Sequence, residues 1–274
     1  MYKYKIVASD LDGTLFDNNS RLGKRNAEAI RELTEKGIHF VPSTGRTYCD
    51  ISLDLRNNEN VRYYICSNGA LVYDKKTGKT VKNGVESSLL KKTLDILYDY
   101  DVHIAIRTGG ECVTDAEKYT DRDFADYNLC EAHIDVLKNF AKAKEGFKEY
   151  LYGVEDAEAL AAFFKSTDDL FECKSRLEAL GGLSVVRQFE YNLDIYSLAT
   201  NKGDALLALA DMVGAAPSET IGVGDSDNDV SLIKAAALGL AVSNASQGLK
   251  DVADEVICSN EENSLAYINE HYFS

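Results

Sequence analysis

The sequence predicts an α/β protein with a Rossmann-like parallel-sheet core and an inserted α+β cap domain. Three observations favour this fold class. Short apolar strands alternate with helical patterns in the first and last parts of the chain. Adjacent strands with hairpin-like turns fill the middle. Polar residues and glycines directly follow several of the predicted strands, as they do at the ligand-binding edge of an open parallel sheet.

The first part of the chain alternates strand and helix signals. Ile6–Ser9 is a short uncharged run that predicts a buried strand. Apolar residues at helical spacing then predict a helix that ends at Gly37, a residue type suited to a helix C-cap. Strands are predicted over 38–41 and 61–66, and the stretch DKKTGK predicts the turn of a hairpin over 71–81.

The last part of the chain repeats this alternation. Apolar runs and helical periodicity predict, in order, a helix over 202–213 that stops at Gly214, a strand over 221–223, a helix to 236, a strand over 238–242, a helix over 247–252, a strand over 256–258, and a closing helix that begins at Ser264. Short apolar strands separated by helices indicate a parallel sheet covered on both faces.

The middle of the chain follows another pattern. Leucines over 89–97 predict a helix, and HIAIR and ECVTD predict two strands around the Gly109-Gly110 turn. Alanine and phenylalanine over 157–164 predict a helix, with another over 171–180, and two strands are expected to meet near Glu190. These elements indicate an antiparallel sheet with helices. We therefore predict an α/β core of residues 1–83 and 191–274, and an inserted α+β domain of residues 84–190.

Charge and composition exclude some partners. The 274 residues carry 30 basic and 45 acidic side chains, for a net charge of −15. Such a chain repels nucleic acid and anionic membranes, so neither is expected as a partner. An active site for an anionic substrate must then supply its own positive charge.

The cysteines and the N-terminus favour a soluble cytoplasmic protein. The six cysteines are scattered without a CxxC pair, which is typical of reduced thiols rather than disulfides or a zinc site. The first residues lack the apolar region of a secretory signal. No run approaches the ~20 apolar residues of a membrane span.

Several polar residues follow the predicted strands and would meet at one edge of a parallel sheet. They are Asp10 and Asp12, Ser43 to Arg46, Asn68 and Gly69, and Gly224 to Asp229, together with Thr200 to Gly203 before a helix. This set combines carboxylates, hydroxyls and a lysine, and it suits a divalent cation together with a phosphate group.

The residue types match phosphoryl transfer. A carboxylate such as Asp10 can attack phosphorus, provided that a cation offsets the charge repulsion. Hard oxygen ligands such as Asp10 and Asp225 suit Mg²⁺. Lys202 adds a point charge, Thr44 adds a hydrogen-bond donor, and Asp12 can move the proton of the leaving oxygen and of water.

Five motifs carry a resemblance to a known family. They are DLDGT at 10–14, TGR at 44–46, NGA at 68–70, NKG at 201–203 and GDSDND at 224–229. Their order and spacing resemble those of the haloacid dehalogenase superfamily, and in particular its Cof-type phosphatases with a large α/β cap (type IIB) before the lysine motif. The resemblance spans nearly the whole chain.

The resemblance implies a role for each matching residue. Asp10 would be the nucleophile and a Mg²⁺ ligand, and Asp12 would be the general acid–base and give Mg²⁺ its backbone carbonyl. Asp225 would be the acidic metal ligand. The other implied positions are phosphate or substrate contacts at Thr44, Gly45, Arg46, Lys202 and Asn228, and metal support from Asp229.

Some positions keep an alternative. Ser43 replaces the alanine that is frequent in the family, and NSLA near the C-terminus replaces a glycine-valine pattern. Arg46 suits a structural ion pair as well as a substrate contact. Arg107, Arg187 and Tyr191 are candidates for the leaving-group contact, but an exposed strand face explains them equally well.

The predicted activity is Mg²⁺-dependent hydrolysis of a small phosphorylated metabolite, a sugar phosphate or similar monoester, through an aspartyl-phosphate intermediate. Two alternatives remain: a phosphosugar mutase on the same scaffold, and a non-catalytic protein that binds a phosphate ester. The sequence does not distinguish a monomer from a homodimer.

Overall fold

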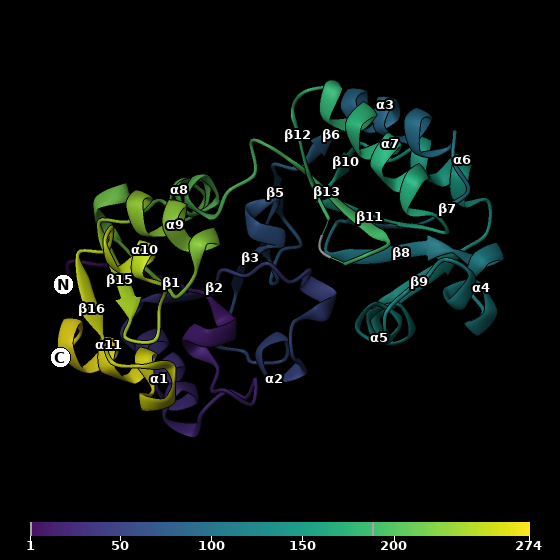
Figure 1. The fold of residues 1–274 in the computed structure, drawn as a ribbon. Helices are drawn as coiled ribbons and strands as arrows, with labels where there is room; N and C mark the ends of the chain where they lie inside the picture. Colours follow the sequence, from purple (N-terminus) through teal and green to yellow (C-terminus); the bar gives the residue numbers. More distant parts are fainter. Residues whose placement is uncertain (1, 188) are drawn as a thin grey trace. The chain divides into compact units, whose positions relative to one another are not determined.

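A computed structural model describes residues 2–187 and 189–274, and contacts divide them into two compact units (Figure 1). The first unit contains the chain up to Arg46, Ile51–Val81 and Asn201–Ser274. The second contains Thr47–Asp50 and Lys82–Thr200. Lys82–Thr200, which makes up most of the second unit, is therefore an insertion between two parts of the first.

The first unit is built on a parallel sheet of five strands in the order β16-β15-β14-β1-β2. The strands are β1 (Ile6–Ser9), β2 (His39–Pro42), β14 (Thr220–Gly224), β15 (Leu238–Val242) and β16 (Glu255–Ile257). Strand β1 is central, with Ile6 in register with His39 on one side and Thr220 on the other. The predicted parallel sheet is confirmed.

A smaller antiparallel sheet lies next to β2 in the same unit. Its strands are β3 (Tyr63–Cys66), β4 (Leu71–Asp74) and β5 (Thr80–Lys82), in that order. A parallel bridge between Ser43 and Ile65 joins the carboxyl ends of β2 and β3. The predicted 71–81 hairpin is confirmed as β4 and β5.

Helices cover both faces of the parallel sheet (Figure 1). Helices α8 (Lys202–Val213) and α9 (Val230–Ala235) lie on one side, and α1 (Lys24–Glu35) and α11 (Ser264–Tyr272) lie on the other. The short helices α2 (Leu53–Arg56) and α10 (Gln247–Lys250) complete the unit. Leu206 and Leu209 of α8 are fully buried against Ile6 of β1 and Ile65 of β3. This apolar contact fixes the start of α8, and hence Lys202, relative to the strand ends.

The second unit contains a six-stranded sheet in the order β12-β13-β11-β7-β8-β9. Its strands are β7 (Val102–Thr108), β8 (Glu111–Asp115), β9 (Ala141–Lys144), β11 (Ala159–Phe164), β12 (Leu183–Val186) and β13 (Asn192–Ser197). All neighbours are antiparallel except β8 and β9. A two-stranded sheet of β6 (Val85–Glu86) and β10 (Asp156–Ala157) lies in the same unit.

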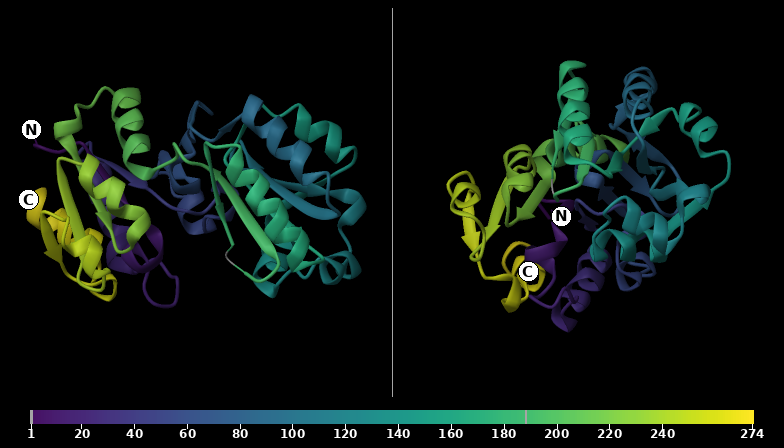
Figure 2. Two further views of the ribbon diagram at one scale, coloured as in Figure 1. Left: turned by 45° about the horizontal axis from the view of Figure 1, so that its top comes forward. Right: turned by 45° about the vertical axis from the view of Figure 1, so that its right-hand side comes forward.

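Helices pack on both faces of this second sheet. One face packs into a large apolar core with α3 (Ser87–Leu97), α6 (Phe147–Tyr152) and α7 (Thr167–Ala179). Figures 1 and 2 show α3 and α7 side by side over it. The other face packs, in part, with α4 (Asp121–Asp126) and α5 (Glu131–Phe140). The expected α+β architecture of the middle region is confirmed.

The helix predicted over 157–164 is wrong, because Ala159–Phe164 forms strand β11. Every residue of β11 is buried, and the strand pairs with β7 on one side and β13 on the other. Alanine favours helices by itself, but a strand buried on both faces accepts small and aromatic residues, and tertiary pairing overrides the local preference. Strand β13, placed after the predicted boundary at 191, pairs with β11 and so lies in the second unit.

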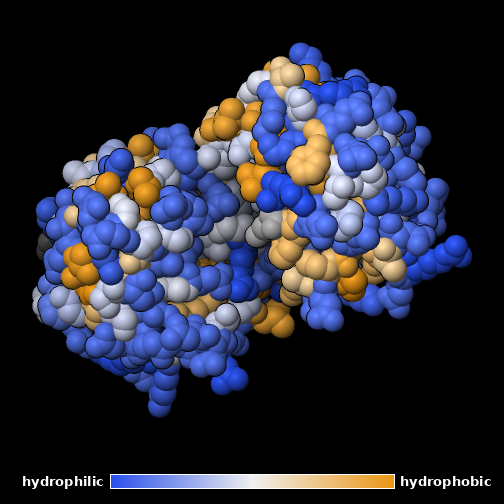
Figure 3. Space-filling view, in the orientation of Figure 1, coloured by the Kyte–Doolittle hydropathy of each residue, from blue (hydrophilic) through white to orange (hydrophobic). Residues whose placement is uncertain are grey.

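The surface matches the composition. Figure 3 shows hydrophilic side chains over most of the face it draws, with apolar residues scattered among them. Within the described residues, no helix combines the length and the apolar character that a membrane span requires.

Candidate active site

The candidate site begins where β1 ends. Asp10 follows Ser9 directly and is 5% exposed, and the chain then makes a tight turn over Leu11–Leu15. Gly13 in this turn has a φ of +81°, and a Cβ atom there would lie 2.8 Å from Oδ2 of Asp225. Glycine is therefore required both for the backbone conformation and for the close approach of the Asp225 carboxylate.

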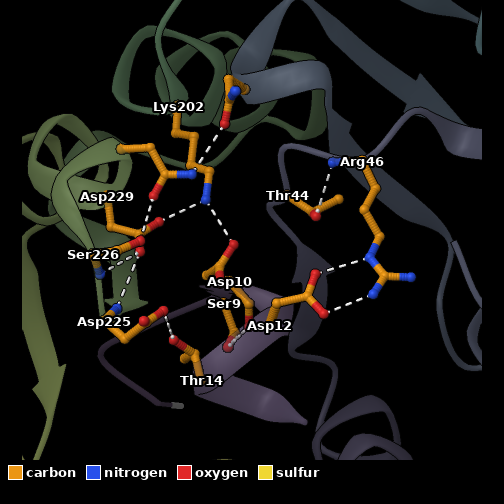
Figure 4. A network of polar contacts seen from close by, with 12 residues as sticks. Ser9, Asp10, Asp12, Thr14, Thr44, Arg46, Lys202, Asp225, Ser226 and Asp229 are labelled. Carbon is orange, nitrogen blue, oxygen red and sulfur yellow. Dashed lines mark hydrogen bonds and ion pairs between the residues drawn. The ribbon is translucent and has the colours of Figure 1, made fainter. Parts of the chain in front are cut away.

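Lys202 lies at the centre of the site (Figure 4). It is the first residue of α8, whose N-cap Asn201 accepts a hydrogen bond from the backbone of Asp204. Its side chain is fully buried, and its Nζ donates to Oδ1 of Asp10 at 2.7 Å and to Oδ1 of Asp229 at 2.6 Å. One ammonium therefore joins two buried carboxylates from separate parts of the chain.

The loop after β14 supplies the remaining acids. Oδ2 of Asp229 accepts the backbone N–H groups of Asp225 and Ser226 at 3.0 and 3.2 Å. Oδ1 of Asp225 accepts the hydroxyl of Thr14 at 2.9 Å. Both oxygens of Asp229 thus accept hydrogen bonds, from Lys202 and from the backbone. The bond from Thr14 uses only Oδ1 of Asp225.

The electrostatics of the site are unbalanced. Burial raises the pKa of Asp10 from 3.8 to about 7; Lys202 lowers it, while Asp229 and Asp225 raise it. Burial also raises the pKa of Asp225. Burial lowers the pKa of Lys202, but Asp10 and Asp229 offset this, so that it lies above its usual value. Lys202 therefore stays charged, but it does not offset burial and the neighbouring carboxylates enough to hold the pKa of Asp10 at its usual value.

This imbalance fits a divalent cation. Asp10, Asp225 and Asp229 each place a carboxylate oxygen within 4.8 Å of the others. Asp10 and Asp225 each have an oxygen that the hydrogen bonds described above do not use. Hard oxygen ligands at such spacing suit Mg²⁺. The donor set therefore fits the cation, with Asp229 held in a supporting position by Lys202 and the backbone.

The loop after β2 contributes Thr44 and Arg46. Thr44 is buried, and its Oγ1 accepts the backbone N–H of Arg46 at 3.1 Å. The guanidinium of Arg46 donates to both oxygens of Asp12, from Nε at 2.8 Å and from Nη2 at 2.7 Å (Figure 4). The structural ion pair that the sequence left open for Arg46 is present, and the Asp12 carboxylate points toward it rather than toward Lys202.

The remaining predicted residues surround this loop. Gly45 lies close to Asn68, whose Oδ1 would be 3.1 Å from a Cβ atom at Gly45. Asn68 accepts a hydrogen bond from Nδ2 of Asn228 at 3.1 Å, and Oδ1 of Asn228 accepts the Ser226 hydroxyl at 2.8 Å. The structure therefore connects the loops after β3 and β14 through two amides.

Two supporting residues had no assigned role in the sequence prediction. Thr14 orients Asp225, and Asn244 donates to the backbone carbonyl of Gly13 at 2.8 Å. Thr14 lies within the DLDGT motif, so the sequence alone could have indicated that it supports the site. Asn244 lies 231 residues from Gly13 in sequence, and no local pattern singles it out.

Comparison with known proteins shows the family of this chain. A family model described as haloacid dehalogenase-like hydrolase matches residues 7–268, and so covers nearly the whole chain. The chain belongs to the haloacid dehalogenase-like hydrolases. The resemblance read from the five motifs is thereby confirmed, and the predicted fold class with it.

Two relatives of this hydrolase are named as phosphatases. The phosphatase YwpJ of Bacillus subtilis is 28% identical over 97% of this chain and 99% of its own. The 5-amino-6-(5-phospho-D-ribitylamino)uracil phosphatase YwtE of the same species is 27% identical over 98% of both chains. This haloacid dehalogenase-like hydrolase is a phosphatase that acts on a phosphorylated substrate.

Solved structures share the fold. A haloacid dehalogenase-like hydrolase from Bacteroides thetaiotaomicron superposes with a TM-score of 0.77 at 25% identity, over 99% of this chain and all of the other. A protein from Thermotoga maritima reaches 0.80 at 20% identity over 99% of this chain and 98% of the other. The second likeness concerns the fold alone.

Proposed function

We propose that this phosphatase hydrolyses a small phosphorylated metabolite with Mg²⁺ through an aspartyl-phosphate intermediate on Asp10. The observation that carries the proposal is the buried Asp10 carboxylate, hydrogen-bonded to Lys202 and adjacent to Asp225 and Asp229. A buried carboxylate with a raised pKa next to one cation is unfavourable for stability alone, and such arrangements are concentrated at functional sites.

In this proposal Asp10 attacks phosphorus and the leaving oxygen departs on the opposite side. The Lys202 ammonium and the Thr44 hydroxyl hold the phosphoryl oxygens, because both are donors fixed in place by burial. Lys202 holds the Asp10 carboxylate through Oδ1, so the carboxylate is already oriented. Since both donors are already in position, little reorganisation accompanies the attack.

Asp12 is the proposed proton carrier. It stands two residues from Asp10 and is accessible, as a group that exchanges protons with a leaving oxygen and then with water must be. Arg46 fixes its carboxylate by a two-point contact. Water that Asp12 deprotonates would then attack the aspartyl phosphate and regenerate Asp10.

Asp10, Asp225 and the backbone carbonyl of Asp12 would hold the cation, which would orient the phosphate and offset its negative charge. Asp229 would keep these groups in place through Lys202 and the backbone of Asp225. Gly45 and Asn228 complete the proposed substrate contacts.

The substrate class is a further part of the proposal. Sugar phosphates and similar phosphomonoesters are our first choice, and two relatives with a named substrate act on a phosphoribityl compound. We expect residues 84–190 to select the leaving group. Within the second unit, Arg107 of β7 lies near Asp194 and Tyr196 of β13, and all three stand on one sheet face. Arg187 instead donates to the backbone of Glu190.

We also expect a cytoplasmic location, where the six free thiols would stay reduced.

The test is hydrolysis of p-nitrophenyl phosphate with Mg²⁺ by the wild type and by Asp10→Asn. Asparagine keeps the shape of the side chain but removes the nucleophile, so we expect kcat to fall by at least about a thousandfold. Mass spectrometry of the acid-quenched wild type should find a phosphate adduct on the peptide that carries Asp10. Wild-type activity in Asp10→Asn would refute the assignment. A panel of phosphorylated metabolites, with products separated, distinguishes hydrolysis from transfer within a sugar phosphate.

A further inference from the structure

A cavity in the first unit lies away from the proposed catalytic residues. It has a volume of about 600 Å³, within the range of small-molecule sites. His39 and Phe40 of β2, Tyr63 of β3 and the neighbouring Arg62 line it, with Lys75 from the turn after β4. None of the residues that form the candidate active site lines this cavity.

The topology of the sheet explains why a cavity forms here. Strands β2 and β3 meet at the bridge between Ser43 and Ile65, close to their carboxyl ends. His39 and Tyr63 are the first residues of the two strands. Their ring centroids lie 5.1 Å apart, in an edge-to-face arrangement. Thr44 and Asn68 follow the opposite ends. Four residues at ~3.3 Å each separate the two ends by roughly 13 Å, so the cavity and the catalytic edge are distinct places.

The cavity presents positive charge on a strongly acidic protein. Arg62, Lys75 and Lys76 line it, against the single carboxylate of Glu59. Arg62 donates from Nε and Nη2 to Asp74, which leaves its Nη1 edge outside this pair. Lys75 donates to the backbone carbonyls of Arg56 and Asn58 at 3.1 and 2.7 Å, which uses two of its three protons. Both cations are therefore fixed in place and keep donors for an anion.

Flat groups form another part of the wall. The guanidinium carbon of Arg62 lies 4.8 Å from the ring centroid of Tyr63, and His39 packs against the same ring. Among the described residues, the ring nitrogens of His39 have no hydrogen-bond partner. Guanidinium and aromatic planes favour stacking with a flat ligand, and the free imidazole adds a polar contact.

We propose that this cavity is a second ligand site, for a small aromatic anion whose ring packs near His39 and whose acidic group meets Lys75 and Arg62. Asp74 pairs with Arg62 and Glu59 offsets one lysine, so a negatively charged ligand would offset the one positive charge that remains. An aromatic ring matches the flat groups of the wall. The site is independent of the proposed hydrolysis, because it shares no lining residue with the catalytic edge.

The test uses 8-anilinonaphthalene-1-sulfonate, an aromatic anion that is not a phosphate ester. Fluorescence titration of the wild type should give saturable binding with a stoichiometry of one. Lys75→Gln should raise the dissociation constant by at least about tenfold, since one ionic hydrogen bond to the ligand is lost. Lys79→Gln is the matched control, because Lys79 lies in the same hairpin, is exposed and does not line the cavity.

A second variant keeps the test informative if Lys75→Gln unfolds. Asn60→Trp puts a large ring into the cavity without removing a charge, and should abolish binding while p-nitrophenyl phosphate hydrolysis stays at the wild-type rate. Equal binding by the wild type and both cavity variants would overturn the proposal, as would an equal loss in Lys79→Gln. Displacement of the probe by inorganic phosphate with Mg²⁺ would place it in the phosphatase site and would also overturn the proposal.

Discussion

The guanidinium of Arg46 binds both carboxylate oxygens of Asp12, through Nε at 2.8 Å and Nη2 at 2.7 Å. A two-point contact restricts the carboxylate to one orientation, which a single point charge does not achieve. Arg46 is thus placed to act through Asp12, the proposed proton carrier.

Arg46→Ala should lower kcat for p-nitrophenyl phosphate, but by less than Asp12→Ala, for which general acid–base catalysis predicts a loss of about 10²- to 10⁴-fold. If Arg46 acts through Asp12, the double variant should be no slower than Asp12→Ala alone. Arg46→Lys is the control that retains the charge and loses the fork. Full additivity of the two single effects would show that Arg46 contributes independently, for example through the substrate.

Lys202→Ala should destabilise the fold strongly. The substitution leaves Asp10 and Asp229 buried without their cation, and breaking a buried ion pair costs about 3–5 kcal/mol. Urea unfolding measures the change. Lys5→Ala is the matched control, because its ion pair with Glu219 at 2.8 Å is partly exposed and should contribute about 0–1 kcal/mol. Similar losses in both variants would contradict the arrangement around Lys202.

The stability of the metal-free protein should depend on pH through Asp10. Its pKa is about 7 in the folded state and near 3.8 in the unfolded state, so between these values the folded state binds the extra proton. The contribution of Asp10 to the free energy of unfolding is therefore fully present below about pH 4 and is lost as the pH rises to 7. Thermal unfolding in EDTA should show this slope, and Asp10→Asn should lack it.

Added Mg²⁺ should reverse that loss. A cation that binds Asp10 competes with its proton, so the rise in melting temperature on adding Mg²⁺ should be larger at pH 8 than at pH 5.5. Differential scanning fluorimetry with and without EDTA measures it. A rise that is the same at both pH values, or that persists unchanged in Asp10→Asn, would exclude Asp10 as a ligand.

Ser43→Ala should be neutral or slightly stabilising. The hydroxyl of Ser43 is buried without a hydrogen-bond partner among the described residues, so its removal ends an uncompensated desolvation. Ser264→Ala is the matched control, because its buried hydroxyl donates to the carbonyl of Thr14 at 2.8 Å and its loss should cost about 0.5–1.5 kcal/mol. Thermal unfolding of both variants checks the contrast. A larger loss in Ser43→Ala than in Ser264→Ala would mean that the Ser43 hydroxyl has a favourable contact.

Much of the first unit was predictable from local patterns. The strand at Ile6–Ser9 is a short buried run, and the helix from Lys202 to Val213 ends at Gly214 in the left-handed conformation, as its glycine indicates. Both signals are local, since they depend on apolar spacing and on the backbone freedom of glycine. The second unit was less predictable. Ala159–Phe164 has the composition of a helix, but its neighbours β7 and β13 make it a strand.

The sequence by itself determined which residue types stand at the ends of the strands: Asp10 after β1, Thr44 after β2 and Asp225 after β14. Their spacing and order follow the chain, and so they carry the family and its chemistry. Only the tertiary structure decided the partners. Lys202 donates a hydrogen bond to Asp10, which lies 192 residues away in sequence, and Arg46 donates to Asp12. Burial and ion-pair geometry depend on how strands that are distant in sequence align in the sheet. The charge state of a side chain depends on its neighbours in space, and no local sequence pattern contains them.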